Sequence, residues 1–187
     1  ADTQACGVLL AWLVMFIRVL VTVAIVYQPL LANLLLPFAA MALLTAVMAG
    51  VYYWLGSQRY VSPQHSALKV SNPFSLVAAI KFGILFAVIL LLVKLTEQYA
   101  AAEGLYLVAA VAGMTDVDAV TLSMTDYARR MPDTLTVAAA GVTIAALSNT
   151  VVKCTLVFAL GSRVLANKLL IATLVILSGG LAALFFR

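Results

Sequence analysis

The chain has 187 residues, of which 65% are hydrophobic and only 10% are charged, and its mean hydropathy is +1.14. Water-soluble domains carry about 45–50% apolar and about 25% charged residues, so this composition excludes a soluble globular protein. The net charge of +4 comes from scattered Lys and Arg residues without a basic patch, which argues against nucleic-acid binding.

A membrane-spanning helix needs about 20 consecutive apolar residues. Six segments meet this requirement, so the sequence predicts an all-α, polytopic transmembrane bundle that forms one domain over residues 1–187. Because the chain starts without Met, we expect it to be the C-terminal part of a larger membrane protein. In chain order the expected spans are Gly7–Tyr27, Leu30–Leu55, Phe74–Leu95, Gly104–Tyr127, Leu135–Leu160 and Lys168–Phe186.

Six passes place both termini on one side of the membrane. Basic residues collect on the cytoplasmic side of membrane proteins, and the expected loops on the side of the termini hold more of them than the opposite loops. We therefore predict cytoplasmic termini. This topology changes if the fourth segment enters the membrane and turns back. The basic residues on the side of the termini are Arg59, Lys69, Arg129, Arg130 and Arg187, against Lys94, Arg163 and Lys168.

Two aspartates, Asp116 and Asp118, lie near the middle of the apolar stretch Gly104–Met124. A carboxylate at the centre of a membrane helix costs about 2.5–3.5 kcal/mol on insertion scales. Such residues face protein or water, and they mark ion pathways, proton relays or charge pairs. We expect both side chains to bind or relay an ion.

Two conformations of this segment are open. Gly113 is a natural break point, and the spacing of Thr115 and Asp118 matches a capping box, in which Thr115 would cap a new helix. A helix that starts inside the membrane is tolerated where its free backbone lines a cavity or lies within protein. If the helix is instead continuous, Asp116 and Asp118 point about 160° apart and serve different neighbours.

Three basic residues also lie inside expected spans, namely Arg18, Lys81 and Lys153. Intramembrane charges pair with one another, so we expect these cations to neutralise the aspartates. The fifth span carries Asn149 and Lys153 on one stripe, with Ser148 beside it. Because asparagine hydrogen-bonds across membrane interfaces, this stripe is expected to face the site.

Nothing in the sequence indicates an enzyme or a cofactor. It contains no Ser-His-Asp set, no glycine-rich phosphate loop and no metalloprotease helix. The two cysteines, Cys6 and Cys154, are far apart and lack the spacing of metal ligands. His65, the only histidine, lies in the longest polar loop and is expected to be solvated.

Four motifs carry a family resemblance: MFIR at Met15–Arg18, NPFSL at Asn72–Leu76, GLYLVAAVAGMTDVDAVTLS at Gly104–Ser123 and LSNTVVK at Leu147–Lys153. Together they resemble a bacterial membrane domain that follows an MgtC/SapB-type domain in many proteins. The resemblance implies a bacterial inner-membrane location and a role related to ions. It also implies that MgtC/SapB-like helices, a partner subunit or a second copy of the chain completes the assembly.

The resulting hypothesis is a transporter or channel-like domain for a small inorganic ion, a cation or a proton. Asp116 and Asp118 would bind the ion, and Thr115, Thr121, Ser148 and Asn149 would supply neutral oxygens. Two carboxylates would suit a hard cation such as magnesium, although the positive N-terminus of a helix would favour an anion. The alternative is a non-transporting subunit or regulator, whose buried charges only fix the packing of the helices.

Overall fold

A computed structural model of the chain describes residues 2–57 and 102–185, with the isolated positions 80, 84, 87, 88 and 91 between them. The predicted third span, the NPFSL motif and the residues His65 and Lys81 therefore lie outside the described residues, apart from those isolated positions. The described part is all-α and contains no strand, which confirms the predicted fold class.

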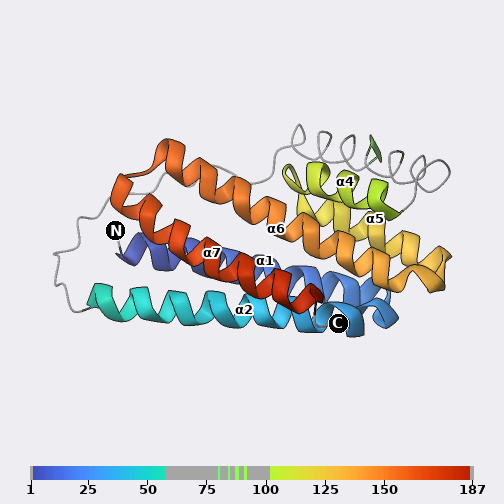
Figure 1. Cartoon of the computed structure of the whole chain (residues 1–187), viewed down its shortest axis with the longest axis horizontal. Coiled ribbons are helices and arrows are strands. Elements are labelled where there is room, and N and C mark those ends of the chain that lie inside the picture. The colour runs from blue at the N-terminus through green and yellow to red at the C-terminus, as the bar shows by residue number, and fades with distance from the viewer. Residues whose placement is uncertain are drawn as a thin grey trace.

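The described residues include four long helices, which run along the major axis of the molecule (Figure 1). They are α1 (Asp2–Val26), α2 (Gln28–Ser57), α6 (Leu135–Leu160) and α7 (Arg163–Phe185). Each is long and apolar enough to cross a membrane, so four of the expected spans are present in this part of the chain. The helices are those of a multi-pass membrane protein.

The predicted fourth span is divided into two short helices, α4 (Ala102–Gly113) and α5 (Val117–Arg130). Both lie over the same half of α6, and the chain turns back between them (Figure 1). A short 3-10 helix, η1 (Pro132–Thr134), then leads into α6. The segment is therefore broken and re-entrant rather than continuous.

The described chain starts at one end of the bundle, and α7 runs from that same end toward the other (Figure 1). Asp2 forms an ion pair with Lys168, in the second turn of α7, whereas α7 ends at Phe185 on the far side. This arrangement favours termini on opposite sides of a membrane, whereas the sequence predicted that they share one side. The difference arises because the chain turns back between α4 and α5.

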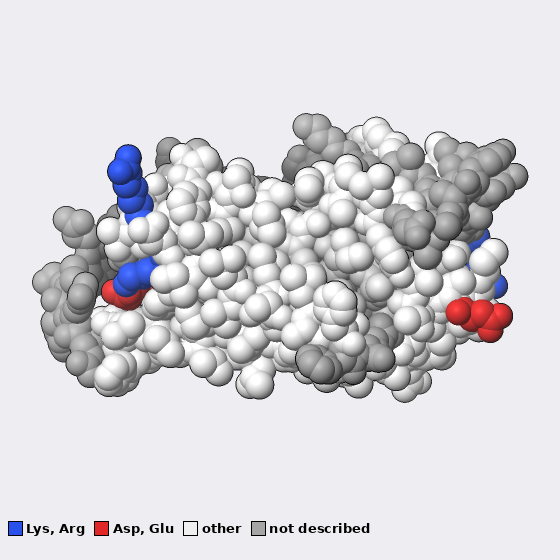
Figure 2. All heavy atoms as spheres, viewed as in Figure 1, with Lys and Arg blue, Asp and Glu red and all other residues white. Residues whose placement is uncertain are grey.

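Charged side chains gather at the two ends of the molecule, and the surface between them is uncharged on the face shown in Figure 2. At one end Lys168 pairs with Asp2 and lies over the ring of Tyr52, 5.6 Å from its centroid. At the other end Arg129 and Arg130 hold Asp126. An apolar band between two charged rims is the surface that a lipid bilayer requires.

Inside the bundle, buried hydroxyl groups are satisfied by the backbone of their own helices. Six buried threonines of the described helices donate to the carbonyl oxygen four residues earlier, as expected for an apolar surrounding. They are Thr45, Thr121, Thr125, Thr143, Thr150 and Thr173. The packing of α1 on α2 is apolar and includes an edge-to-face contact between Phe16 and Phe38, with ring centroids 6.1 Å apart.

Candidate functional site

The break between α4 and α5 is held against α6 by a close backbone contact. A Cβ atom on Gly113 would lie 2.5 Å from the Cα and 2.7 Å from the carbonyl oxygen of Ala145. No side chain fits at this distance, so glycine is required for α4 to approach α6. The sequence expectation that Gly113 marks the break is confirmed.

The polar groups of the broken backbone are satisfied within the protein. The N–H groups of Thr115 and Asp116 both donate to the carbonyl oxygen of Ala112, each at 3.0 Å. The carbonyl oxygen of Gly113, which ends α4, accepts a hydrogen bond of 2.9 Å from the side-chain Nδ2 of Asn149. Asn149 therefore links the break to α6 by a hydrogen bond, as expected from the polar stripe on the fifth predicted span.

The second half-helix is capped by Asp116. Its backbone is extended, with φ −153° and ψ 115°, and its Oδ1 accepts a hydrogen bond of 2.8 Å from the N–H of Asp118. The predicted capping box is therefore wrong, because the helix starts one residue later than expected and Thr115 lies exposed in the turn. A negatively charged cap also suits the positive end of the helix dipole.

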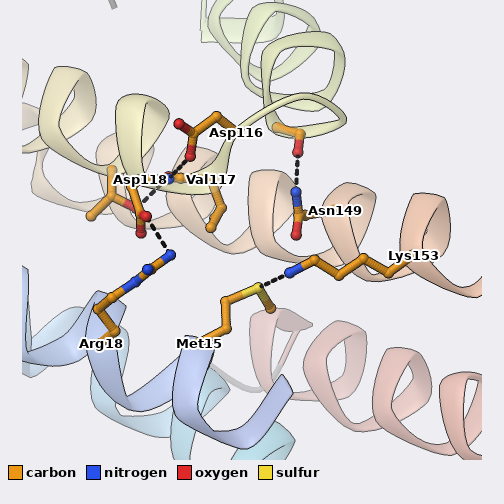
Figure 3. A network of polar contacts seen from close by, with 9 residues as sticks. Met15, Arg18, Asp116, Val117, Asp118, Asn149 and Lys153 are labelled. Carbon is orange, nitrogen blue, oxygen red and sulfur yellow. Dashed lines mark hydrogen bonds and ion pairs between the residues drawn. The ribbon is translucent and has the colours of Figure 1, made fainter. Parts of the chain in front are cut away.

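Asp118 forms an ion pair with Arg18, which reaches the site from α1 (Figure 3). This pair was expected from the sequence, and it joins two helices that lie far apart in the chain. The side chain of Arg18 remains 59% exposed and that of Asp118 is 26% exposed. The pair thus lies at the edge of the described bundle rather than in its centre.

Lys153 enters the same space from α6, but it makes no ion pair with either aspartate within the described residues. Its Nζ donates instead to the thioether sulfur of Met15, at 2.9 Å. Asp116 and Asp118 act on it only as nearby charges. The expectation that Lys153 helps to neutralise the aspartates stays a prediction, and the structure adds a contact with a thioether that the sequence did not suggest.

The remaining predicted residues lie outside this cluster. Thr121 is buried one turn beyond Asp118 and donates to the carbonyl oxygen of Val117. Ser148 lines an open apolar pocket of about 280 Å³, together with Met114 and Leu177. Within the described residues the site therefore consists of Met15, Arg18, Asp116, Asp118, Asn149 and Lys153.

Sequence reasoning missed two features. Met15 lies one turn before Arg18 on the same face of α1, which is the only sequence signal for its place in the site. The ion pair of Asp2 and Lys168 was missed because Asp2 precedes the first expected span and Lys168 stands at the very start of the last one. In the described parts of the chain no group of three His, Cys, Asp or Glu side chains could hold a metal ion.

Comparison with known proteins identifies a family. A family model described as "Domain of unknown function (DUF4010)" matches residues 1–161. The chain belongs to the DUF4010 family. A similar protein of Aquifex aeolicus (strain VF5), described as "Uncharacterized protein", is 30% identical over 160 residues, which are 84% of this chain and 67% of that protein. No solved structure matches the chain. Neither description names an MgtC/SapB domain, so the predicted link to that group is not part of this identification.

Proposed function

We propose that this DUF4010 protein transports a small ion, a cation or a proton, through the site at the break between α4 and α5. The observation that carries the proposal is the pairing of two features at one place. A membrane-embedded helix is interrupted at Gly113, and the side chains of Arg18, Asp116, Asp118 and Lys153 converge beside the interruption (Figure 3). Interrupted helices with ionisable side chains are typical of ion-binding sites in transporters.

The negative charge of Asp116 favours a cation or proton over an anion. An uncapped helix start would present free N–H groups and a positive potential, which favour an anion. Here the carboxylate of Asp116 lies at the start of α5 and already accepts a hydrogen bond from the N–H of Asp118. The positive end of the helix is thereby neutralised, and the objection to a cation at this position is weakened.

The partner and the location are part of the same proposal. Arg18 lies about two turns before the end of α1 at Val26, and its side chain is 59% exposed at a depth where lipid would be a poor neighbour. We expect MgtC/SapB-like helices, another subunit or a second copy of the chain to cover this side. The protein would act in the bacterial inner membrane, as a component of ion homeostasis.

The ion pair of Arg18 and Asp118 favours a second candidate function. Because it joins α1 to α5, it could serve only to hold the bundle together. The protein would then be a non-transporting subunit or regulator. The two functions differ in what happens when the charge is removed and the fold is kept.

The test is ion flux in proteoliposomes. The intact chain is compared with Asp116→Asn and Asp118→Asn, using H⁺, Na⁺, K⁺ and Mg²⁺ gradients. Asp126→Asn is the matched control, since Asp126 pairs with two arginines at the rim of the bundle and not in the site. Transport is supported if both site variants remain folded and lose flux while the control keeps it. It is refuted if no tested ion moves, or if the site variants retain full flux.

A further inference from the structure

Two polar groups on α6, the ammonium group of Lys153 and the side-chain oxygen of Asn149, lie one helical turn apart without a strong hydrogen-bond partner. The ammonium of Lys153 donates to the sulfur of Met15, and a thioether is a weak acceptor. Asn149 is only 6% exposed, and its Oδ1 has no hydrogen-bond partner among the described groups. Figure 3 shows this oxygen on the side of Asn149 that faces away from Gly113 and toward Lys153.

The other charged groups of the site, and Lys168 at the rim, are held differently. Asp118 is held by Arg18, whose guanidinium stays charged in proteins, and Asp116 accepts a backbone N–H. Lys168, the other lysine of the described residues, has the carboxylate of Asp2 and the ring of Tyr52 as partners. Among the cations named here, Lys153 is therefore the one whose direct partner is weakest.

A small molecule between Lys153 and Asn149 would satisfy both groups if it could accept one hydrogen bond and donate another. Water has both capacities, whereas a metal cation would be repelled by the ammonium group. Because buried amide oxygens are almost always satisfied by protein or water, the free Oδ1 indicates a hydrated position beside Lys153.

We propose that the proton is a transported ion of this site, and that Lys153 releases and rebinds it through water bound to Asn149. This inference rests on the proposed transport function and names the ion and its carrier. In the step, an N–H bond of Lys153 breaks and its electron pair stays on Nζ. The proton passes to water, which carries it to one side of the membrane, and Nζ later takes a proton from water that is open to the other side.

Three charged residues from neighbouring helices face Lys153 in the described structure: Arg18 from α1, and Asp116 and Asp118 from α5. Arg18 repels the charged form of Lys153, and the two carboxylates attract it. The ion pair between Arg18 and Asp118 weakens the attraction, because a large part of the Asp118 charge is already compensated. Within the described residues the nearest contact of the Lys153 ammonium group is therefore a thioether, while both carboxylates already have other partners.

The test compares proton flux in two variants of Lys153. If the role of Lys153 is structural, Lys153→Arg should keep more flux, whereas if Lys153 carries the proton, Lys153→His should keep more. Lys153→Arg keeps the positive charge and the hydrogen-bonding capacity but cannot release a proton at neutral pH. Lys153→His is shorter and fits the packing less well, but it exchanges protons. Proton flux is measured in proteoliposomes with a trapped pH-sensitive dye, and folding is checked by size exclusion and thermal melting.

We expect Lys153→Arg to reduce proton flux at least tenfold, while Lys153→His retains measurable flux. Lys168→Arg, the matched control at the rim, should keep the flux of the intact chain. Equal or higher flux with Arg than with His would overturn the role of Lys153 and leave ion transport itself intact. Movement of a metal cation without protons would also overturn it. If no ion moves in the intact chain, the proposed function fails and this inference falls with it.

Discussion

Gly113→Ala tests how tightly the break depends on the contact between α4 and α6. The added methyl group would lie 2.5 Å from the Cα and 2.7 Å from the carbonyl oxygen of Ala145, both backbone atoms that cannot rotate away. Overpacking of this kind costs about 1–3 kcal/mol. If α4 moves outward, the hydrogen bond from Asn149 is lost as well, at about 0.5–1.5 kcal/mol.

Gly50→Ala is the matched control for this substitution. Gly50 lies inside α2, and a Cβ atom there would meet nothing within 4 Å. Alanine in a helix interior is favoured over glycine by about 0.5–1 kcal/mol, so this variant should be as stable as the intact chain or more stable. The assay is thermal or denaturant-induced unfolding in detergent, followed by circular dichroism.

Two results would refute the reasoning. The first is a Gly113→Ala variant as stable as Gly50→Ala, which would mean that α4 does not pack on α6 at this distance. The second is full rescue of Gly113→Ala by Ala145→Gly. That change removes only the Cβ of Ala145, at 2.8 Å, and leaves the nearer backbone atoms in place, so rescue should be incomplete.

Three further predictions concern single side chains. Asp116→Asn should keep the cap of α5 and the stability of the fold, whereas Asp116→Ala should lose about 0.5–2 kcal/mol of stability, as judged by unfolding in detergent. Asn149→Leu should cost about 1–3 kcal/mol in the same assay, because it leaves the carbonyl oxygen of Gly113 unpaired, and unchanged stability would contradict the hydrogen bond. Tyr52→Phe should lower stability by about 0.5–1.5 kcal/mol through loss of its hydrogen bond to Lys168, whereas Tyr53→Phe, whose side chain is 70% exposed, should change nothing measurable.

The spanning helices could be predicted from the sequence because bilayer thickness fixes the length of an apolar segment. The expected starts and ends of four spans agree with α1, α2, α6 and α7 to within a few residues at most positions. The break could also be anticipated, since a glycine followed by capping residues inside an apolar segment favours the end of one helix and the start of another.

The details of the site could not be predicted from the sequence, because they depend on tertiary contacts between helices. Thr115 and Asp116 are both good capping residues, and the turn of the chain over Ala145 decides which of them starts α5. The partner of Lys153 could not be deduced, because it depends on where α1 lies relative to α6. The turn of the chain between α4 and α5 could not be predicted with certainty, because hydropathy does not distinguish a crossing segment from one that turns back.

The ion pairs at the two rims set the depth at which the bundle lies in the membrane. α1 has 25 residues and is about 37 Å long, slightly more than the hydrocarbon thickness of about 30 Å. A shift of the bundle by one turn along the membrane normal would pull either Asp2 and Lys168 or Asp126 and its arginines into the hydrocarbon interior. The interrupted segment, which lies between the two charged rims, should therefore keep a fixed depth in the bilayer.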